Sequence, residues 1–133
     1  MSISGSCLCG EVNFEIDGDF ESFYLCHCKY CKKDTGSAHA SNLFSSVAKL
    51  TWKSGQDKVT TYRLSSTKHI KSFCSNCGSA LPNLQMSNKL LVVPAGSLNQ
   101  DISIKPNAHI FTSSRESWEC GLENIKSYEK FPQ

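Results

Sequence analysis

Residues 74–78 read Cys-Ser-Asn-Cys-Gly, and residues 7–10 read Cys-Leu-Cys-Gly. Each stretch carries two closely spaced cysteines followed by a glycine, and cysteine pairs of this kind bring two sulfurs onto one tetrahedral Zn²⁺. The glycine lets the backbone turn tightly next to the sulfurs. Because the two stretches are alike, we join them and predict a closed four-sulfur site that ties the start of the chain to its middle. A bound ion there can add on the order of 10 kcal/mol to the folding free energy. The predicted ligands are Cys7, Cys9, Cys74 and Cys77.

A third cysteine cluster lies between these two. Residues 26–31 read Cys-His-Cys-Lys-Tyr-Cys and supply three cysteines in six positions. Three protein ligands leave the fourth position of Zn²⁺ to water or substrate, which is the pattern of catalytic sites. A fourth protein ligand would make the site structural instead, and His27, His69 and Cys120 are the candidates. The spacing predicts two zinc ions per chain, with the second held by Cys26, Cys28 and Cys31.

Disulfide and redox roles have to be weighed against metal binding, because the chain has 8 cysteines in 133 residues. Residues 1–9 lack the basic and apolar regions of a secretory signal, and no stretch reaches the roughly 18 apolar residues of a membrane helix. We therefore expect a cytoplasmic protein, in which thiols stay reduced and clustered cysteines bind metals. A thioredoxin-like role would place one motif inside a βαβ unit. The spacing favours metal binding over both alternatives.

The charge of the chain argues against a polyanionic partner. The formal net charge is +2 with neutral cysteines. Seven thiolates add seven negative charges and two Zn²⁺ add four positive ones, which turns the balance into −1. A protein so close to neutrality has no bulk attraction to nucleic acid, and aromatic and basic residues do not alternate along the chain. We expect no nucleic-acid partner and no membrane association, and the sequence does not fix the oligomeric state.

Short strand-like patterns run through most of the sequence. Polar and apolar residues alternate in 11–16, which is typical of a half-buried strand, and 59–64 is rich in β-branched and aromatic residues. Residues 29–34 could form one helical turn that Gly36 ends, and 118–132 a further turn with an extended end. The pattern predicts a mainly β protein of short antiparallel strands, stapled by zinc, with a single domain over residues 1–133. Further strands are expected at 22–25, 49–53, 69–73 and 90–93, and weaker ones at 102–104 and 109–111.

Five segments carry a resemblance to a known family. They are Gly-Ser-Cys-Leu-Cys-Gly-Glu-Val at 5–12, Cys-His-Cys-Lys-Tyr-Cys at 26–31 with Thr-Gly-Ser at 35–37, Phe-Cys-Ser-Asn-Cys-Gly-Ser-Ala-Leu at 73–81, Ala-Gly-Ser-Leu-Asn at 95–99 and Pro-Asn-Ala-His-Ile at 106–110. In this order, and with Trp118 beyond them, they resemble the glutathione-dependent formaldehyde-activating enzyme family, whose domain also occurs in centromere protein V. The resemblance covers the chain from Gly5 to about Trp118.

The resemblance implies a β-tent fold and an activity. It implies a structural zinc on Cys7, Cys9, Cys74 and Cys77, and a catalytic zinc on Cys26, Cys28 and Cys31. It also implies a carbon–sulfur lyase similar to S-(hydroxymethyl)glutathione synthase, which joins glutathione to formaldehyde. Family membership does not by itself fix the substrate.

The chemistry of a three-thiolate zinc site is compatible with that activity. Sulfur donation weakens the metal as a Lewis acid, so bound water would be a poor source of hydroxide, whereas a thiol is a suitable soft ligand. Addition of a thiol such as glutathione to a small aldehyde, or the reverse cleavage, therefore fits better than hydrolysis of peptides or phosphates. The alternative is a non-catalytic zinc-binding module that binds a protein partner, with the middle cluster closed by a fourth ligand. A metal or redox buffer is a third reading.

Several residues outside the predicted ligand sets have two readings each. His27 lies between two ligands, so its ring is expected to point away from the metal and to serve either the reaction or the packing. His109 has the same two readings. The lysines at 29, 32 and 33 either steer an anionic thiol or form a solvated basic turn, which is the favoured reading. Cys120 is expected to be a free thiol with a packing role.

Overall fold

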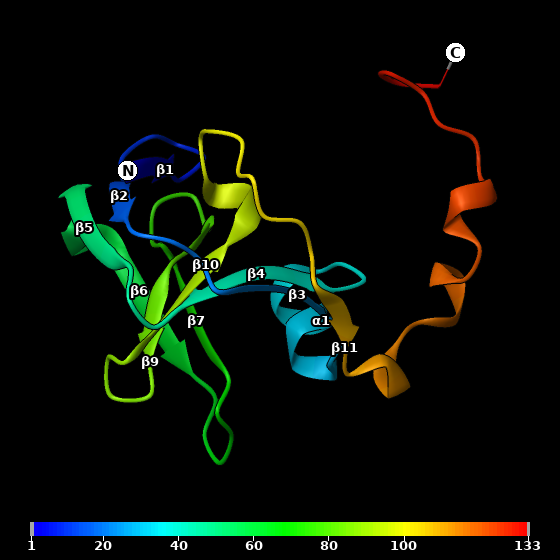
Figure 1. Ribbon diagram of the computed structural model, residues 1–133, viewed down its shortest axis with the longest axis horizontal. Helices are drawn as coiled ribbons and strands as arrows, with labels where there is room; N and C mark the ends of the chain where they lie inside the picture. Colours follow the sequence, from blue (N-terminus) through cyan, green and yellow to red (C-terminus); the bar gives the residue numbers. More distant parts are fainter. Residues whose placement is uncertain (1, 133) are drawn as a thin grey trace.

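The structure is a computed structural model that describes residues 2–132, and this part of the chain is mainly β with one short α-helix (Figure 1). Its strands form three sheets. The first is antiparallel, with the order β1-β2-β5, and consists of β1 (Ser2–Ser6), β2 (Asn13–Asp17) and β5 (Lys49–Ser54). Another is antiparallel, with the order β6-β7-β8, and consists of β6 (Val59–Arg63), β7 (Ile70–Cys74) and β8 (Ala80–Leu81).

The five-stranded sheet carries the middle cysteine cluster. Its order is β11-β3-β4-β10-β9, and all neighbours are antiparallel except β11 and β3, which run parallel. The mainly β fold of short, mostly antiparallel strands is therefore confirmed. The strands are β3 (Ser22–Cys26), β4 (Ala40–Ser45), β9 (Asn83–Gln85), β10 (Leu90–Pro94) and β11 (Ala108–Ile110).

The hydrophobic core joins residues from all three sheets. Alternate residues of β2, Phe14 and Ile16, are buried as the sequence pattern predicts, and the Phe14 and Trp52 rings pack in an edge-to-face arrangement with their centroids 5.8 Å apart. Cys7 and Cys74 belong to the same buried cluster, so the four-cysteine group lies against the core. The other core members are Val12, Phe23, Leu43, Leu81, Leu91 and Val93.

The helix α1 (Lys29–Thr35) begins where the sequence predicts and runs one residue beyond the predicted range 29–34, up to Gly36. Cys28 is its N-cap, and the Cys28 sulfur accepts a hydrogen bond from the Cys31 N–H at 3.3 Å. At the other end Gly36 has a φ of 64°, and its N–H donates to the Lys32 carbonyl at 2.8 Å. Glycine adopts this left-handed backbone conformation more easily than other residues, and the helix ends there.

One of the weaker strand predictions is wrong. Residues 102–104 form no strand, although Ile102 and Ile104 are partly buried against the core. The burial of these two side chains produces the alternating pattern, but no hydrogen-bonded ladder forms beside them. The other weak candidate, 109–111, is confirmed with a shift of one residue as β11 (Ala108–Ile110), which pairs with β3.

After β11 the chain leaves the body of the molecule (Figure 1). It continues through single 3₁₀ turns, and many of its apolar side chains are exposed, including Trp118 and Phe131. None of the helices in residues 2–132 is long and apolar enough to cross a membrane. The 3₁₀ turns of the chain are η1 (Gln56–Lys58), η2 (Ala95–Ser97), η3 (Thr112–Ser114), η4 (Ser117–Glu119) and η5 (Leu122–Asn124).

Candidate functional site

The structure brings the four cysteines of the predicted closed site together. The sulfurs of Cys7, Cys9, Cys74 and Cys77 all lie within 4.8 Å of one another. The Cys7 and Cys9 sulfurs are 3.5 Å apart, and those of Cys9 and Cys74 are 3.9 Å apart. Sulfurs on a tetrahedral Zn²⁺ with bonds of about 2.3 Å are separated by about 3.8 Å. The donor set and its spacing therefore fit a zinc ion.

Two turns and their hydrogen bonds hold this group. Gly10 and Gly78 have φ values of 82° and 80°, and their N–H groups donate to the carbonyls of Cys7 and Cys74. The sulfurs accept hydrogen bonds from other donors. The Val12 N–H lies 3.3 Å from the Cys7 sulfur, and the Asn76 amide lies 3.2 Å from the Cys9 sulfur. Such bonds stabilise thiolates and orient them toward a metal.

Ser79 favours the thiolate form of Cys77. Its hydroxyl lies 3.3 Å from the Cys77 sulfur and accepts a hydrogen bond from the Leu8 N–H at 2.8 Å. Hydrogen bonds from the Ser79 side chain and backbone lower the pKa of Cys77 to about 5. This cysteine is therefore ionised at neutral pH, which is the form that binds a metal.

The second group forms where β3 passes into α1. Cys26 ends the strand, Cys28 caps the helix and Cys31 lies in the first helical turn, so that their sulfurs come within 4.8 Å of one another. Burial raises the pKa of Cys26 and, more strongly, that of Cys31. Burial also opposes ionisation of Cys28, but the hydrogen bonds that its sulfur accepts, first from the Cys31 N–H, leave its pKa below the usual value. A divalent cation is what would allow all three to ionise together.

The three-cysteine group contains no fourth Cys, His, Asp or Glu from residues 2–132. His27, considered above as a fourth ligand, is buried and directs its Nε2 atom toward His109, 2.8 Å away. His69 instead places its Nε2 atom 2.7 Å from a carboxylate oxygen of Asp34. Cys120 lies in the tail and is exposed, so its predicted packing role is wrong.

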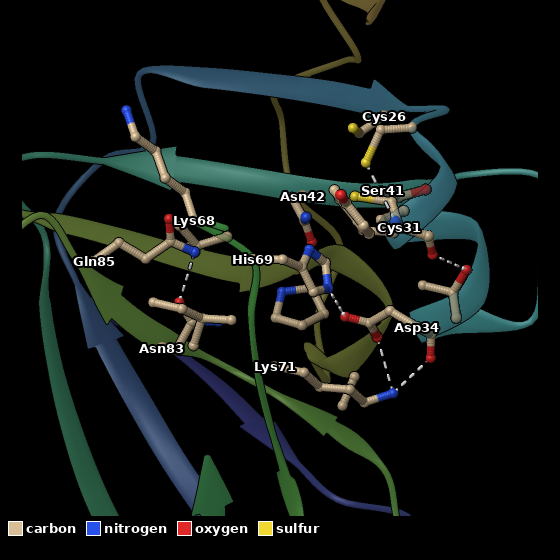
Figure 2. A pocket seen from close by; sticks show the side chains of 18 of the residues that line it. Cys26, Cys31, Asp34, Ser41, Asn42, Lys68, His69, Lys71, Asn83 and Gln85 are labelled. Carbon is tan, nitrogen blue, oxygen red and sulfur yellow. Dashed lines mark hydrogen bonds and ion pairs between the residues drawn. The ribbon is translucent and has the colours of Figure 1, made fainter. Parts of the chain in front are cut away.

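A cavity of about 770 Å³ borders the three-cysteine group (Figure 2). In Figure 2 the labelled Cys26 and Cys31 lie at one end of the cavity, and Lys68 and Gln85 lie at the other. The volume is within the range of about 300–1,000 Å³ that small-molecule sites occupy. Polar side chains from α1, several strands and a loop line the space between the two ends: Asp34, Ser41, Asn42, His69, Lys71 and Asn83.

Asp34 connects α1 to the segment that carries His69 and Lys71, and all three side chains line the cavity. One carboxylate oxygen lies 2.7 Å from His69, and the other lies 2.9 Å from the Lys71 ammonium. Lys71 also donates to the Asp34 carbonyl at 2.7 Å. Sequence reasoning missed Asp34 and Lys71 as site residues. A usable signal was that His69 and Lys71 are two apart on a predicted strand and so share one face.

The lysines near the cluster divide between the cavity and the tail. Lys29 lines the cavity, with its ammonium 5.3 Å from the centre of the Tyr30 ring. Lys32 instead donates to the carbonyl of Ser114 and to a carboxylate oxygen of Glu116, both at 2.6 Å. Lys32 therefore anchors the tail to α1 and does not line the cavity, whereas Lys29 lines the cavity and is exposed.

Fold and site together define a class: a small, mainly β protein with two cysteine groups suited to metal ions, the smaller of which opens onto a cavity. The sequence matches the family described as "Glutathione-dependent formaldehyde-activating enzyme" over residues 2–114. The chain therefore belongs to this family, and membership supports a glutathione-linked role in formaldehyde activation.

Two known proteins illustrate the similarity. A protein of Halomonas elongata is 26% identical over 125 residues, which cover 89% of this chain and 80% of the relative, and it carries the provisional name glutathione-dependent formaldehyde-activating enzyme. A crystal structure of a Rhodobacter sphaeroides protein, solved as a structural genomics target, superposes with a TM-score of 0.57 and 21% identity. It covers 80% of this chain and 99% of its own, and it supports the fold alone.

Proposed function

We propose that the chain is a zinc-dependent carbon–sulfur lyase similar to S-(hydroxymethyl)glutathione synthase. It would join the thiol of glutathione, or of a similar small thiol, to formaldehyde or another small aldehyde, and catalyse the reverse cleavage. The observation that carries the proposal is the three-cysteine group, which has no fourth protein ligand in residues 2–132 and faces a cavity of about 770 Å³.

The proposed reaction forms a C–S bond and an O–H bond and breaks the S–H bond and the C=O π bond. The thiol sulfur adds to the carbonyl carbon, the C=O π bond breaks, and the thiol proton ends on the new hydroxyl oxygen. Zinc held by Cys26, Cys28 and Cys31 would favour the thiolate form of the substrate, whereas zinc held by Cys7, Cys9, Cys74 and Cys77 would be structural. We propose that thiol binding occurs in the cytoplasm, where glutathione-type thiols stay reduced.

The cavity lining can bind the rest of a peptide-like thiol. The side-chain amides of Asn42, Asn83 and Gln85 and the hydroxyl of Ser41 provide donors and acceptors for amide groups. Lys68 has no ion pair within residues 2–132 and lies at the end of the cavity away from the cysteines (Figure 2). This separation suits a ligand with a thiol at one end and a carboxylate at the other.

Exchange NMR with ¹³C-formaldehyde tests the proposal. The zinc-loaded protein should accelerate exchange between free formaldehyde and the S–CH₂–OH adduct of glutathione. Cys31→Ser should keep the fold and lose the acceleration, and the exposed Cys120→Ser should keep both. If the zinc-loaded protein does not raise the exchange rate above that of the protein-free reaction, with glutathione or with other small thiols, the non-catalytic zinc module becomes the better interpretation.

Binding of the thiol at the three-cysteine group has its own test. In Co²⁺-substituted protein, glutathione should strengthen the sulfur-to-cobalt charge-transfer bands as a fourth sulfur enters. Cys120→Ser should leave this response intact. A response that is absent at saturating thiol, or that Cys120→Ser abolishes, would mean that the protein closes its own site.

A further inference from the structure

A cluster of three ligand-type side chains lies beside the Cys26–Cys28 segment and takes no part in the proposed reaction. His27, His39 and Glu119 each place one ligand atom within 4.8 Å of the other two. They come from distant parts of the chain: the turn between β3 and α1, the residue before β4, and η4 in the tail. His27 is fully buried, and the Glu119 side chain is 5% exposed.

Two ring nitrogens in this cluster lack hydrogen-bond partners. His27 Nδ1 and His39 Nδ1 are both shielded from solvent, and neither makes a hydrogen bond of acceptable geometry within residues 2–132. Glu119 Oε1 is 2.9 Å from His27 Nδ1, but its direction does not suit an N–H donor on that ring. Buried polar atoms are nearly always satisfied, so these two nitrogens need a partner that residues 2–132 do not supply, and an ion beside the carboxylate would be one.

Neighbouring contacts prepare His27 and Glu119 as ligands. His27 Nε2 lies 2.8 Å from His109 Nδ1, and when Nε2 carries the proton it donates there and leaves the lone pair on Nδ1. Glu119 Oε2 accepts a hydrogen bond from the Glu116 N–H at 2.9 Å, which leaves Oε1 for the cluster. Metal-binding histidines and carboxylates are commonly fixed in this way by a second layer of partners.

We propose that His27 Nδ1, one ring nitrogen of His39 and Glu119 Oε1 form a third metal site, separate from the two cysteine groups. Two imidazoles and one carboxylate are a ligand set for Zn²⁺ or another borderline divalent transition ion, and three protein ligands leave a position open to water. Ligand atoms on such an ion lie about 3.3 Å apart, so the 2.9 Å between His27 and Glu119 has to widen slightly.

The competing reading is a purely structural network in which Glu119 orients His27. Arg115 supports it, because its Nε atom lies 3.5 Å from Glu119 Oε1 and supplies a positive charge without an ion. The two readings differ in measurable ways. A metal site binds one more ion than the cysteine groups do and changes the imidazole nitrogens when the ion binds, whereas the network does neither.

Zinc stoichiometry of the full chain tests the site. Protein equilibrated with buffered free Zn²⁺ should hold one ion more than either His39→Gln or Glu119→Gln, whatever the number held by the cysteine groups. Glu123→Gln is the matched control, since it removes an exposed carboxylate from the same tail that belongs neither to the cluster nor to the Lys32 anchor, and it should keep the wild-type count. Sulfur-to-cobalt bands and far-UV circular dichroism should be the same in all four proteins, which shows that fold and cysteine groups are intact.

Imidazole ¹⁵N shifts provide the second measurement. Addition of the last equivalent of Zn²⁺ should move the ring nitrogens of His27 and His39 in the wild type and leave them in place in Glu119→Gln. Equal zinc counts in wild type and both cluster variants, or ring signals that do not respond to zinc, would overturn the proposal. Neither measurement depends on a thiol or an aldehyde, so failure here and failure of the proposed enzyme activity are distinguishable.

Discussion

Replacing Cys77 with alanine should lower the free energy of unfolding, and the structure allows the loss to be estimated. Cys77 is one of four sulfurs that join residues 7–9 to 74–77, and the Cys9 and Cys74 sulfurs belong to residues 65 apart in the sequence. By the relation used for disulfides, a cross-link that closes a loop of that length contributes about 4 kcal/mol through the entropy of the unfolded chain. Cys77 is only half-buried, so its loss removes little packing.

The effect should appear as a lower melting temperature. For a chain of this size, a loss of about 4 kcal/mol lowers Tm by roughly 15 °C. The assay is thermal unfolding at a buffered free Zn²⁺ concentration that is too low for three sulfurs to retain the ion. Cys120→Ala, which removes an exposed sulfur outside both groups, is the control and should melt with the wild type.

A Cys77→Ala protein that melts within about 2 °C of the wild type under these conditions would refute the reasoning. It would mean that the first sheet and the β6-β7-β8 sheet hold together without the cluster, through the core alone. The assignment of this group as the structural site would then be lost, while the geometry of the three-cysteine group would be unaffected.

Three further predictions follow from the same structure. Mild chelation should remove ions outside the four-sulfur group first, with far-UV circular dichroism unchanged while metal analysis falls; simultaneous unfolding would contradict this. On acidification, zinc should leave the three-cysteine group at higher pH. Burial raises the pKa of two of its three ligands, Cys26 and Cys31, although that of Cys28 is lowered; in the four-sulfur group the pKa of Cys77 is lowered to about 5 and that of Cys7 is lowered too, although burial raises that of Cys74. Protons therefore compete better at the three-cysteine group, and zinc release followed against pH, with Cys31→Ser as reference, checks the order. Leu43→Ala, at a fully buried core position, should lower the free energy of unfolding by about 2–5 kcal/mol in urea titrations, and a change under 1 kcal/mol would contradict the core assignment.

The strands that sequence reasoning found are those whose side chains alternate or run apolar, such as β2 and β10. It missed β4 (Ala40–Ser45), the central partner of β3 and β10, because the buried positions include the small Ala40 and the polar Ser45. Ser45 can be buried because its hydroxyl donates a hydrogen bond to the Asp19 carbonyl at 2.7 Å. The local sequence around Ser45 gives no indication of this contact. β1 was missed for a related reason: Gly5 is required there by the Phe14 ring, which a Cβ would approach within 2.2 Å.

The cysteine groups were predictable because their cysteines come in short clusters, Cys7–Cys9, Cys26–Cys31 and Cys74–Cys77, with recognisable spacing. The His27 cluster was not, since His39 and Glu119 are brought to His27 by the pairing of Cys26 with Ala40 and by the anchoring of the tail on Lys32. Neither the strand pairing nor the anchoring of the tail can be recognised from the spacing of residues in the sequence. The cavity lining was equally hard to predict, because its polar side chains come from α1, β4, β7, β9 and the loop before β7, which are far apart in the sequence.

The distance in sequence between the two halves of the four-cysteine group also sets an order of events during synthesis. Residues 7 and 9 emerge from the ribosome long before residues 74 and 77, and at 5–20 residues per second the interval is roughly 3 to 13 s. For that time Cys7 and Cys9 are unprotected thiols on an incomplete chain. A nascent chain arrested before residue 74 should therefore be alkylated at Cys7, and one released past the last strand, in the presence of zinc, should be protected. Equal alkylation of both would show that the ion does not control this step.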